Sequence, residues 1–115
     1  MNLEKIQETL EAFAQERDWN QYHSPKNLAM ALSVEVAELL EHFQWLTQEE
    51  SANLTEPSLE TIRAEIADVQ IYLLRLADKL DIDIASAVEA KIAENNEKYP
   101  AERVKGSSAK YTDYK

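Results

Sequence analysis

The sequence contains no cysteine, one glycine and three prolines in 115 residues. Without cysteine there is neither a disulfide framework nor a thiolate metal site. The one glycine, Gly106, cannot by itself form a phosphate-binding loop of the GxxxxGK type, and no serine lies in the glycine-rich elbow of nucleophilic hydrolases. The scarcity of glycine and proline favours helices over strands and hairpins.

Long apolar runs and basic character are also missing. No stretch approaches the roughly 18 apolar residues of a membrane span, and residues 1–5 lack the basic and apolar regions of a signal peptide. Lysine and arginine number 12 against 22 acids, a net charge of −10. Because such a surface repels a nucleic-acid backbone, we expect no polymeric nucleic-acid partner. The missing membrane span and signal peptide lead us to expect a cytoplasmic protein with no membrane partner. A small polyanion is not excluded, provided that bound metal reverses the local charge.

Periodicity and capping signals predict a single all-α domain over residues 1–115, built as a four-helix bundle. The helices are expected at residues 2 to about 17, 24 to about 46, about 59 to 80, and 84 to about 99. Asn2, Ser24 and Asp83 are the expected N-caps, and Pro25 follows Ser24 at a first helical position. Residues 47–58 are expected to form a polar connection, and residues 101–115 an irregular C-terminal tail.

Two pairs of acidic residues mark the second and third predicted helices. Glu35 and Glu38 are three residues apart, as are Glu65 and Asp68, so each pair shares a helix face with Cβ atoms roughly 5–6 Å apart. Glu35 falls at the border of the apolar stripe, where a carboxylate needs a charged partner or becomes protonated. Together the pairs would make a four-carboxylate cluster that is stable only if it holds cations. Solvated surface charge is the alternative that spacing alone leaves open.

The ligand types favour a hard divalent metal. Carboxylates without thiolates suit Mg²⁺ or Mn²⁺ better than Zn²⁺. Di-iron bundles use Glu-x-x-His pairs, and neither His23 nor His42 has a glutamate three residues before it. We interpret His42 as a structural residue.

The third predicted helix has two further faces of interest. Tyr72 and Arg75 lie on the same edge as the acid pair, whereas Ile71 and Leu74 are expected on the opposite, outer side. A second apolar patch on a small bundle indicates an oligomer interface.

The order of these features resembles a known family. Glu-x-x-Glu followed by Phe-Gln-Trp lies at residues 35–45, and Glu-x-x-Asp followed by Ile-Tyr at residues 65–72. Asp-Trp-x-x-Tyr-His-x-Pro-x-Asn-Leu precedes them at 18–28, and Lys-x-x-x-Asn-x-x-x-Tyr-Pro at 91–100 and Lys-Tyr-Thr-Asp at 110–113 follow. This arrangement closely resembles the all-α nucleoside triphosphate pyrophosphatases, the MazG-like superfamily, and within it the dCTP pyrophosphatase branch. The resemblance covers essentially the whole chain.

The resemblance implies an activity and an assembly. The expected reaction is Mg²⁺-dependent hydrolysis of a deoxynucleoside triphosphate between the α and β phosphates, with Mn²⁺ as a substitute metal. It would give a monophosphate and pyrophosphate, favour dCTP-type pyrimidines and clean the nucleotide pool. The implied assembly is a homodimer, or a homotetramer built from dimers, with sites completed by neighbouring subunits. The alternatives are another nucleotide preference, such as dUTP or dATP, and a non-catalytic helical interaction module.

The resemblance also assigns roles to single residues. It implies that the metal ligands are Glu35, Glu38, Glu65 and Asp68. Glu38 and Glu35 are the expected catalytic carboxylates, and Glu38 is our choice of general base. The residues that would enclose the base and sugar are Trp19, His23, Trp45 and Tyr72. A packing role for Tyr72 is the alternative.

The C-terminal part supplies the remaining substrate-binding residues that the resemblance implies. Lys91 and Asn95 would reach the phosphates and a sugar hydroxyl, and Tyr99 repeats on the same helix edge. Lys110 and Tyr111 in the tail 101–115 would close over the triphosphate. A solvated surface position is the alternative for Lys91.

Overall fold

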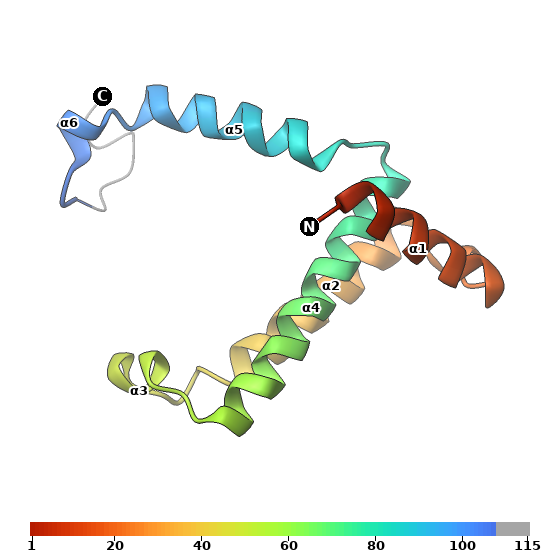
Figure 1. Cartoon of the computed structure of the whole chain (residues 1–115), viewed down its shortest axis with the longest axis horizontal. Coiled ribbons are helices and arrows are strands. Elements are labelled where there is room, and N and C mark those ends of the chain that lie inside the picture. The colour runs from red at the N-terminus through yellow and green to blue at the C-terminus, as the bar shows by residue number, and fades with distance from the viewer. Residues whose placement is uncertain (108–115) are drawn as a thin grey trace. The chain divides into compact units, whose positions relative to one another are not determined.

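The structure, a computed structural model, describes residues 1–107 as two compact units, Met1–Ile82 (unit 1) and the part of Asp83–Lys115 up to residue 107 (unit 2). Unit 1 contains the helices α1 (Leu3–Glu16), the short 3-10 helix η1 (Asn20–Tyr22), α2 (Pro25–Glu41), α3 (Gln48–Ala52) and α4 (Glu56–Lys79), and unit 2 contains α5 (Ile84–Lys98) and α6 (Ala101–Val104) (Figure 1). Residues 1–107 contain no strand, which confirms the all-α fold class. Within this range no helix is both long and apolar enough to cross a membrane.

Three of the four predicted helix starts are confirmed. The side chains of Asn2, Ser24 and Asp83 each accept a hydrogen bond from a backbone N–H in the first turn of α1, α2 and α5. These contacts satisfy donors that a helix N-terminus otherwise leaves without a partner. Pro25 follows Ser24 as the first residue of α2, where its missing N–H removes no helical bond.

Two helices of unit 1 end on an aspartate in the left-handed conformation. Asp18 after α1 has φ 53°, and Asp81 after α4 has φ 59°. At the end of α1 the N–H of Trp19 bonds to the carbonyl of Ala14 (2.9 Å), and that of Asp18 to the carbonyl of Gln15 (3.1 Å). This pair of hydrogen bonds is the Schellman motif, in which glycine is the usual residue at the left-handed position. Aspartate takes that place here because it tolerates the left-handed region better than most other residues.

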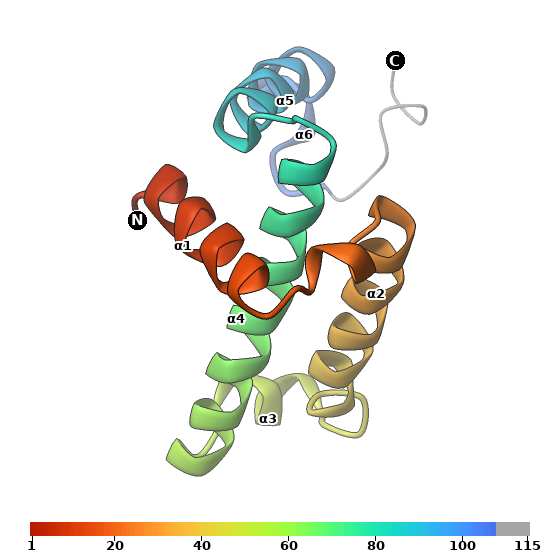
Figure 2. The same cartoon turned by 90° about the vertical axis from the view of Figure 1, so that its right-hand side faces the viewer.

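The helices of unit 1 pack against α4. α2 lies along α4, and α1 crosses the C-terminal half of α4 (Figure 2). The hydrophobic residues that these contacts bury, among residues 1–107, are Ala14, Leu28, Ile62, Leu74 and Ala77. The pairing of α2 with α4 brings together the two helices that carry the acid pairs.

The predicted number and ends of the helices are wrong in four places. α2 ends at Glu41, about one turn before the expected end at residue 46. α3 forms inside the expected polar connection, where Thr47 and Glu50 make a capping box. α4 begins at Glu56, so Pro57 lies in its first turn. With α6 in the expected irregular tail, residues 1–107 contain six α-helices and not four.

The predicted outer face of α4 needs a correction. Leu74 was expected on the outer side, but it is 1% exposed, whereas Ile71 is 37% exposed. α1 contacts α4 close to Leu74, through the hydrogen bonds from Gln7 to Asp78 and from Arg75 to Glu11. By contrast, Ile66 and Leu73 of the same helix are 54% and 41% exposed. Unit 1 therefore carries apolar side chains that its own helices do not cover.

Candidate functional site

Three of the predicted metal ligands meet between α2 and α4. Glu35 and Glu38 come from neighbouring turns of α2, and Glu65 comes from the facing side of α4. One carboxylate oxygen of each lies within 4.8 Å of the others, and all three side chains are half-buried. Spacing on α2 and the packing of α2 along α4 are therefore enough to assemble this group, which we call the acid cluster.

Asp68 lies at the edge of the acid cluster. It is exposed and does not belong to the group of three within 4.8 Å. Its negative charge nevertheless acts on Glu35, because it is one of the charges that raise the pKa of that residue. Its role as a fourth ligand stays a prediction.

The acid cluster is electrostatically unfavourable without a cation. Burial raises the pKa of Glu35, and a hydrogen bond with Glu38 and the charges of Glu38, Asp68 and Glu65 raise it further. Oε2 of Glu35 and Oε2 of Glu65 are buried without a hydrogen-bond partner among residues 1–107. The imidazole of His42 lies beside the cluster, with Nε2 3.7 Å from Oε1 of Glu65. Buried oxygens of this kind, from carboxylates alone, fit a hard divalent cation.

An apolar cavity of about 230 Å³ lies between α1, the 18–23 segment and α4. It is lined by Leu10, Phe13, Ala14, Trp19, His23, Ile71, Tyr72 and Arg75. Three of the predicted base-binding residues, Trp19, His23 and Tyr72, thus share one cavity. We call it the aromatic pocket.

The end of α1 places Trp19 in this pocket. The Schellman motif turns the chain back so that Trp19 packs on Phe13, with ring centroids 5.6 Å apart and planes at 70°. The guanidinium of Arg17 covers the Phe13 ring at 3.6 Å. An edge-to-face aromatic pair of this geometry is favourable, so the helix end fixes one wall of the pocket.

Other predicted substrate-binding residues do not line this pocket. Trp45 is 86% exposed, because α2 ends at Glu41 and the following turn carries Trp45 away from the helix surface. Lys91, Asn95 and Tyr99 belong to unit 2, where all three are exposed on or beside α5. Lys110 and Tyr111 lie outside the described residues. The roles of these five residues stay predictions.

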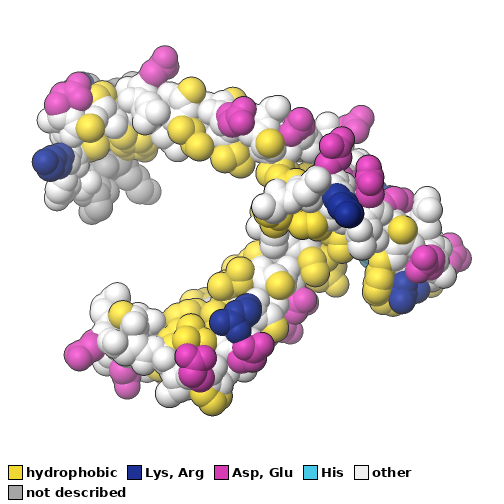
Figure 3. All heavy atoms as spheres, viewed as in Figure 1, with side chains coloured by type: hydrophobic (Ala, Val, Ile, Leu, Met, Phe, Trp, Pro, Cys, Tyr) yellow, Lys and Arg dark blue, Asp and Glu magenta, His cyan; other side chains and the backbone are white. Residues whose placement is uncertain are grey.

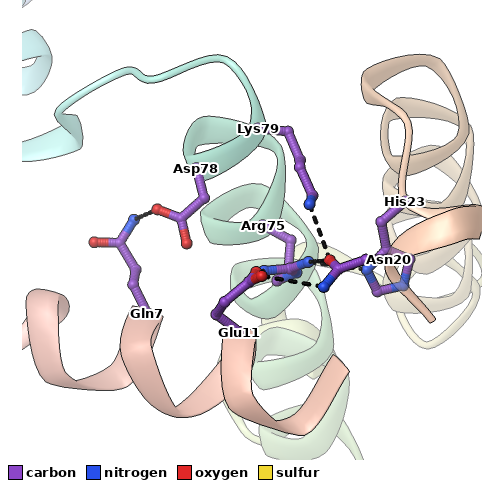
Figure 4. Close-up of polar contacts among 7 residues, drawn as sticks. All are labelled: Gln7, Glu11, Asn20, His23, Arg75, Asp78 and Lys79. Carbon is purple, nitrogen blue, oxygen red and sulfur yellow. Dashed lines mark hydrogen bonds and ion pairs between the residues drawn. The ribbon is translucent and has the colours of Figure 1, made fainter. Parts of the chain in front are cut away.

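A polar network that sequence reasoning missed borders the aromatic pocket. Arg75 of α4 is 2% exposed, and its Nη1 donates to Oε2 of Glu11 of α1 at 2.5 Å. Its Nη2 donates to Oδ1 of Asn20 at 2.8 Å and lies 3.1 Å from Nδ1 of His23. Nζ of Lys79 also donates to Oδ1 of Asn20, at 2.9 Å. Figure 4 shows these side chains converging from α1, α4 and the 18–23 segment.

One signal for this network was present in the sequence. Arg75 follows Tyr72 by three residues and so shares the helix edge of the acid pair. No spacing rule, however, pairs Arg75 with Glu11, which lies 64 positions earlier in the chain. The hydrogen bond from Arg75 lowers the pKa of Glu11, so this pair is ionised at neutral pH.

Comparison with known proteins points to one family. The sequence model of the MazG-like family matches residues 30–114, a range that includes both acid pairs. Over 113 residues the chain is 42% identical to dCTP pyrophosphatase 1 of Mus musculus, a match that covers 96% of this chain and 66% of the mouse protein. The human dCTP pyrophosphatase 1 matches with the same identity and coverage. The chain thus spans just under two thirds of these homologous proteins.

A solved structure supports the fold. A pyrophosphatase from Archaeoglobus fulgidus is 44% identical to this chain, with a TM-score of 0.82. The match covers 87% of this chain and 94% of the archaeal one. At this identity the likeness extends to sequence as well as to the helical architecture.

Proposed function

Because the chain belongs to the MazG-like family, we propose that it is a nucleoside triphosphate pyrophosphohydrolase dependent on a divalent metal. The proposed reaction cleaves a deoxynucleoside triphosphate between the α and β phosphates, giving the monophosphate and pyrophosphate, as a nucleotide-pool cleaning step. The observation that carries the proposal is the acid cluster, in which carboxylate oxygens of Glu35 and Glu65 are buried with no hydrogen-bond partner among residues 1–107. The 42% identity with dCTP pyrophosphatase 1 favours dCTP-type substrates.

The acid cluster and the aromatic pocket suit the two ends of such a substrate. Glu65 and Tyr72 lie on the same edge of α4, seven residues apart, which corresponds to a rise of about 10 Å. A nucleoside triphosphate can bridge that distance, with its base among the aromatic side chains and its phosphates at the carboxylates. Trp19 and Tyr72 offer ring surfaces, on which any base can stack.

The carboxylates have distinct proposed roles. Glu35, Glu38 and Glu65, with Asp68 at the edge, would hold Mg²⁺, for which Mn²⁺ is the substitute. Bound Mg²⁺ would supply charge neutralisation, a polarised phosphoryl group and a water of lowered pKa. Glu38 is the carboxylate that we propose accepts the proton of the attacking water.

We also propose a homo-oligomer, a dimer or a tetramer built from dimers. Only five hydrophobic residues among residues 1–107 are buried, whereas Met30, Val34, Leu40 and Ile66 are each more than half exposed. Figure 3 shows hydrophobic side chains on the surface of α4 and along α5. Apolar surface on this scale favours association with a second copy. A neighbouring subunit would also explain Trp45, since a tryptophan that its own chain leaves exposed can line an adjacent site.

One assay tests the proposed function. The purified protein is incubated with each deoxynucleoside triphosphate and Mg²⁺, and pyrophosphate is measured separately from orthophosphate. We expect pyrophosphate, with dCTP turned over best, and loss of turnover in Glu38→Gln. Glu41→Gln is the matched control, because Glu41 is an exposed acid on the same helix outside the acid cluster. Orthophosphate as the product would refute α–β cleavage, and no turnover of any nucleotide would favour the interaction module.

A further inference from the structure

The contact between Arg75 and His23 fixes the chemistry of the imidazole. A guanidinium has only hydrogen-bond donors, so Nδ1 of His23, at 3.1 Å from Nη2 of Arg75, must be the acceptor. A neutral imidazole that accepts at Nδ1 carries its proton on Nε2. His23 therefore offers an N–H donor on the ring nitrogen that Arg75 does not occupy.

The surroundings keep His23 neutral. Burial lowers its pKa, and the positive charges of Arg75 and Lys79 on α4 lower it further. Glu11 on α1 acts in the opposite direction, but it is bound to Arg75 and Asn20. The geometry and the charges agree on one state of the ring.

A purely structural role explains the Arg75 network less well. Buried ion pairs contribute little net stability, because desolvation of both charges offsets their attraction. Moreover, Nε of Arg75 is buried with no acceptor among residues 1–107, although a stabilising network normally satisfies its buried donors. The same side chain lines the aromatic pocket beside Trp19 and Tyr72. A cavity of about 230 Å³ is smaller than typical whole-ligand sites and suits one part of a substrate, such as a single base.

We propose that Arg75 is a positioning residue that holds His23 as an Nε2–H donor for an acceptor atom of the substrate base. The inference rests on the proposed function and deepens it. In this proposal Arg75 acts through His23, because it determines the tautomer and the orientation of the ring that contacts the base. The pocket would thereby recognise bases that present a carbonyl oxygen or an unprotonated ring nitrogen to His23.

Nitrogen-15 NMR of the histidine side chains tests the first half of the proposal. The chain has two histidines, so His42 supplies an internal reference. We expect His23 as the neutral Nε2–H tautomer at pH 7, and a mixed or protonated ring in Arg75→Met. Arg75→Lys keeps a donor and should recover the tautomer in part. An Nδ1–H or protonated His23 in the wild type, or an unchanged ring in Arg75→Met, would overturn the proposal.

Ligand binding tests the second half and does not require turnover. Arg75→Met should weaken binding of dCMP about 10-fold, the value of one lost hydrogen bond, and leave binding of deoxyribose 5-phosphate unchanged, since that ligand lacks a base. Arg63→Met is the matched control, because Arg63 is an exposed arginine of the same helix. The stabilisation by Mg²⁺ should be unchanged in Arg75→Met, which shows that the fold and the acid cluster persist.

The outcomes separate this inference from the proposed function. If the wild type hydrolyses nucleotides but Arg75→Met binds dCMP normally, or loses both ligands equally, only the positioning role is refuted. If the wild type hydrolyses no nucleotide, the proposed function fails and the base-recognition role fails with it.

Discussion

Replacing Glu35 by glutamine should stabilise the metal-free protein and abolish most of its response to Mg²⁺. In the acid cluster the carboxylate oxygens of Glu35, Glu38 and Glu65 lie within 4.8 Å of one another. Two unit charges at that distance repel by about 3 kcal/mol at an effective dielectric constant of about 20, and by about 1 kcal/mol in bulk water. Because Glu35 is half-buried, we expect a gain of about 1–3 kcal/mol in the free energy of unfolding at pH 8. The new amide can also donate to a neighbouring carboxylate.

The pH dependence gives the sign of this effect. The raised pKa of Glu35 means that the folded protein binds this proton more tightly than the unfolded chain. Its destabilising charge is therefore present above the raised pKa and disappears as the pH falls toward the ordinary glutamate value. The advantage of Glu35→Gln should shrink along the same course, since protonated wild type and variant then carry the same charge at this position.

The assay is urea denaturation with and without Mg²⁺. At a concentration 100 times its dissociation constant, a ligand specific for the folded state stabilises it by about 2.7 kcal/mol. Removal of one metal ligand should weaken the affinity for Mg²⁺ by about 100-fold or more. At the same Mg²⁺ concentration the variant would then be stabilised by only about 0.4 kcal/mol. Glu41→Gln should behave like the wild type in both conditions. Equal stabilisation of wild type and Glu35→Gln by Mg²⁺, or a metal-free variant less stable than the wild type, would refute the metal-site reasoning.

Three further predictions concern the fold. Leu28→Ala should lower the free energy of unfolding by about 2–5 kcal/mol in a denaturant titration, because the Leu28 side chain of α2 is fully buried; a loss below 1 kcal/mol would mean that this site is not core. Asp18→Val should destabilise by about 1–2 kcal/mol relative to Asp18→Gly, since φ is 53° there, and equal melting temperatures would argue against the left-handed turn. The pKa of Glu11 is lowered by Arg75, so the wild type should lose stability as the pH falls from the ordinary glutamate pKa through this lowered pKa. Glu11→Gln should lack that loss. Parallel curves of stability against pH for the two proteins would show that the pair with Arg75 does not form.

The sequence predicted three of the four helix starts and the acid cluster because both depend on local spacing. The caps at Asn2, Ser24 and Asp83 need only a short polar side chain before an apolar periodic segment. The meeting of Glu35 and Glu38 with Glu65 follows from helix periodicity and the packing of two amphipathic helices.

The sequence did not predict features that depend on tertiary context. The end of α2 at Glu41 has no glycine or proline to mark it, so the sequence placed that end about one turn too late. Leu74 was expected on the outer face, because periodicity gives the apolar faces of a helix but not the side on which α1 will pack. The contact of Arg75 with Glu11 joins residues distant in sequence, for which one chain alone offers no signal.

The first helix holds a wall of the aromatic pocket with little apolar anchorage of its own. Among the residues of α1 only Ala14 is buried. The side-chain hydrogen bonds between α1 and α4 run from Gln7 to Asp78 and from Arg75 to Glu11. The free energy needed to open a segment with few buried apolar contacts is lower than the free energy needed to unfold the whole domain. Detachment of α1 would dismantle the pocket and leave the carboxylates of α2 and α4 together. Affinity for the base is then reduced by the fraction of molecules in which α1 is detached, whereas affinity for the metal is not.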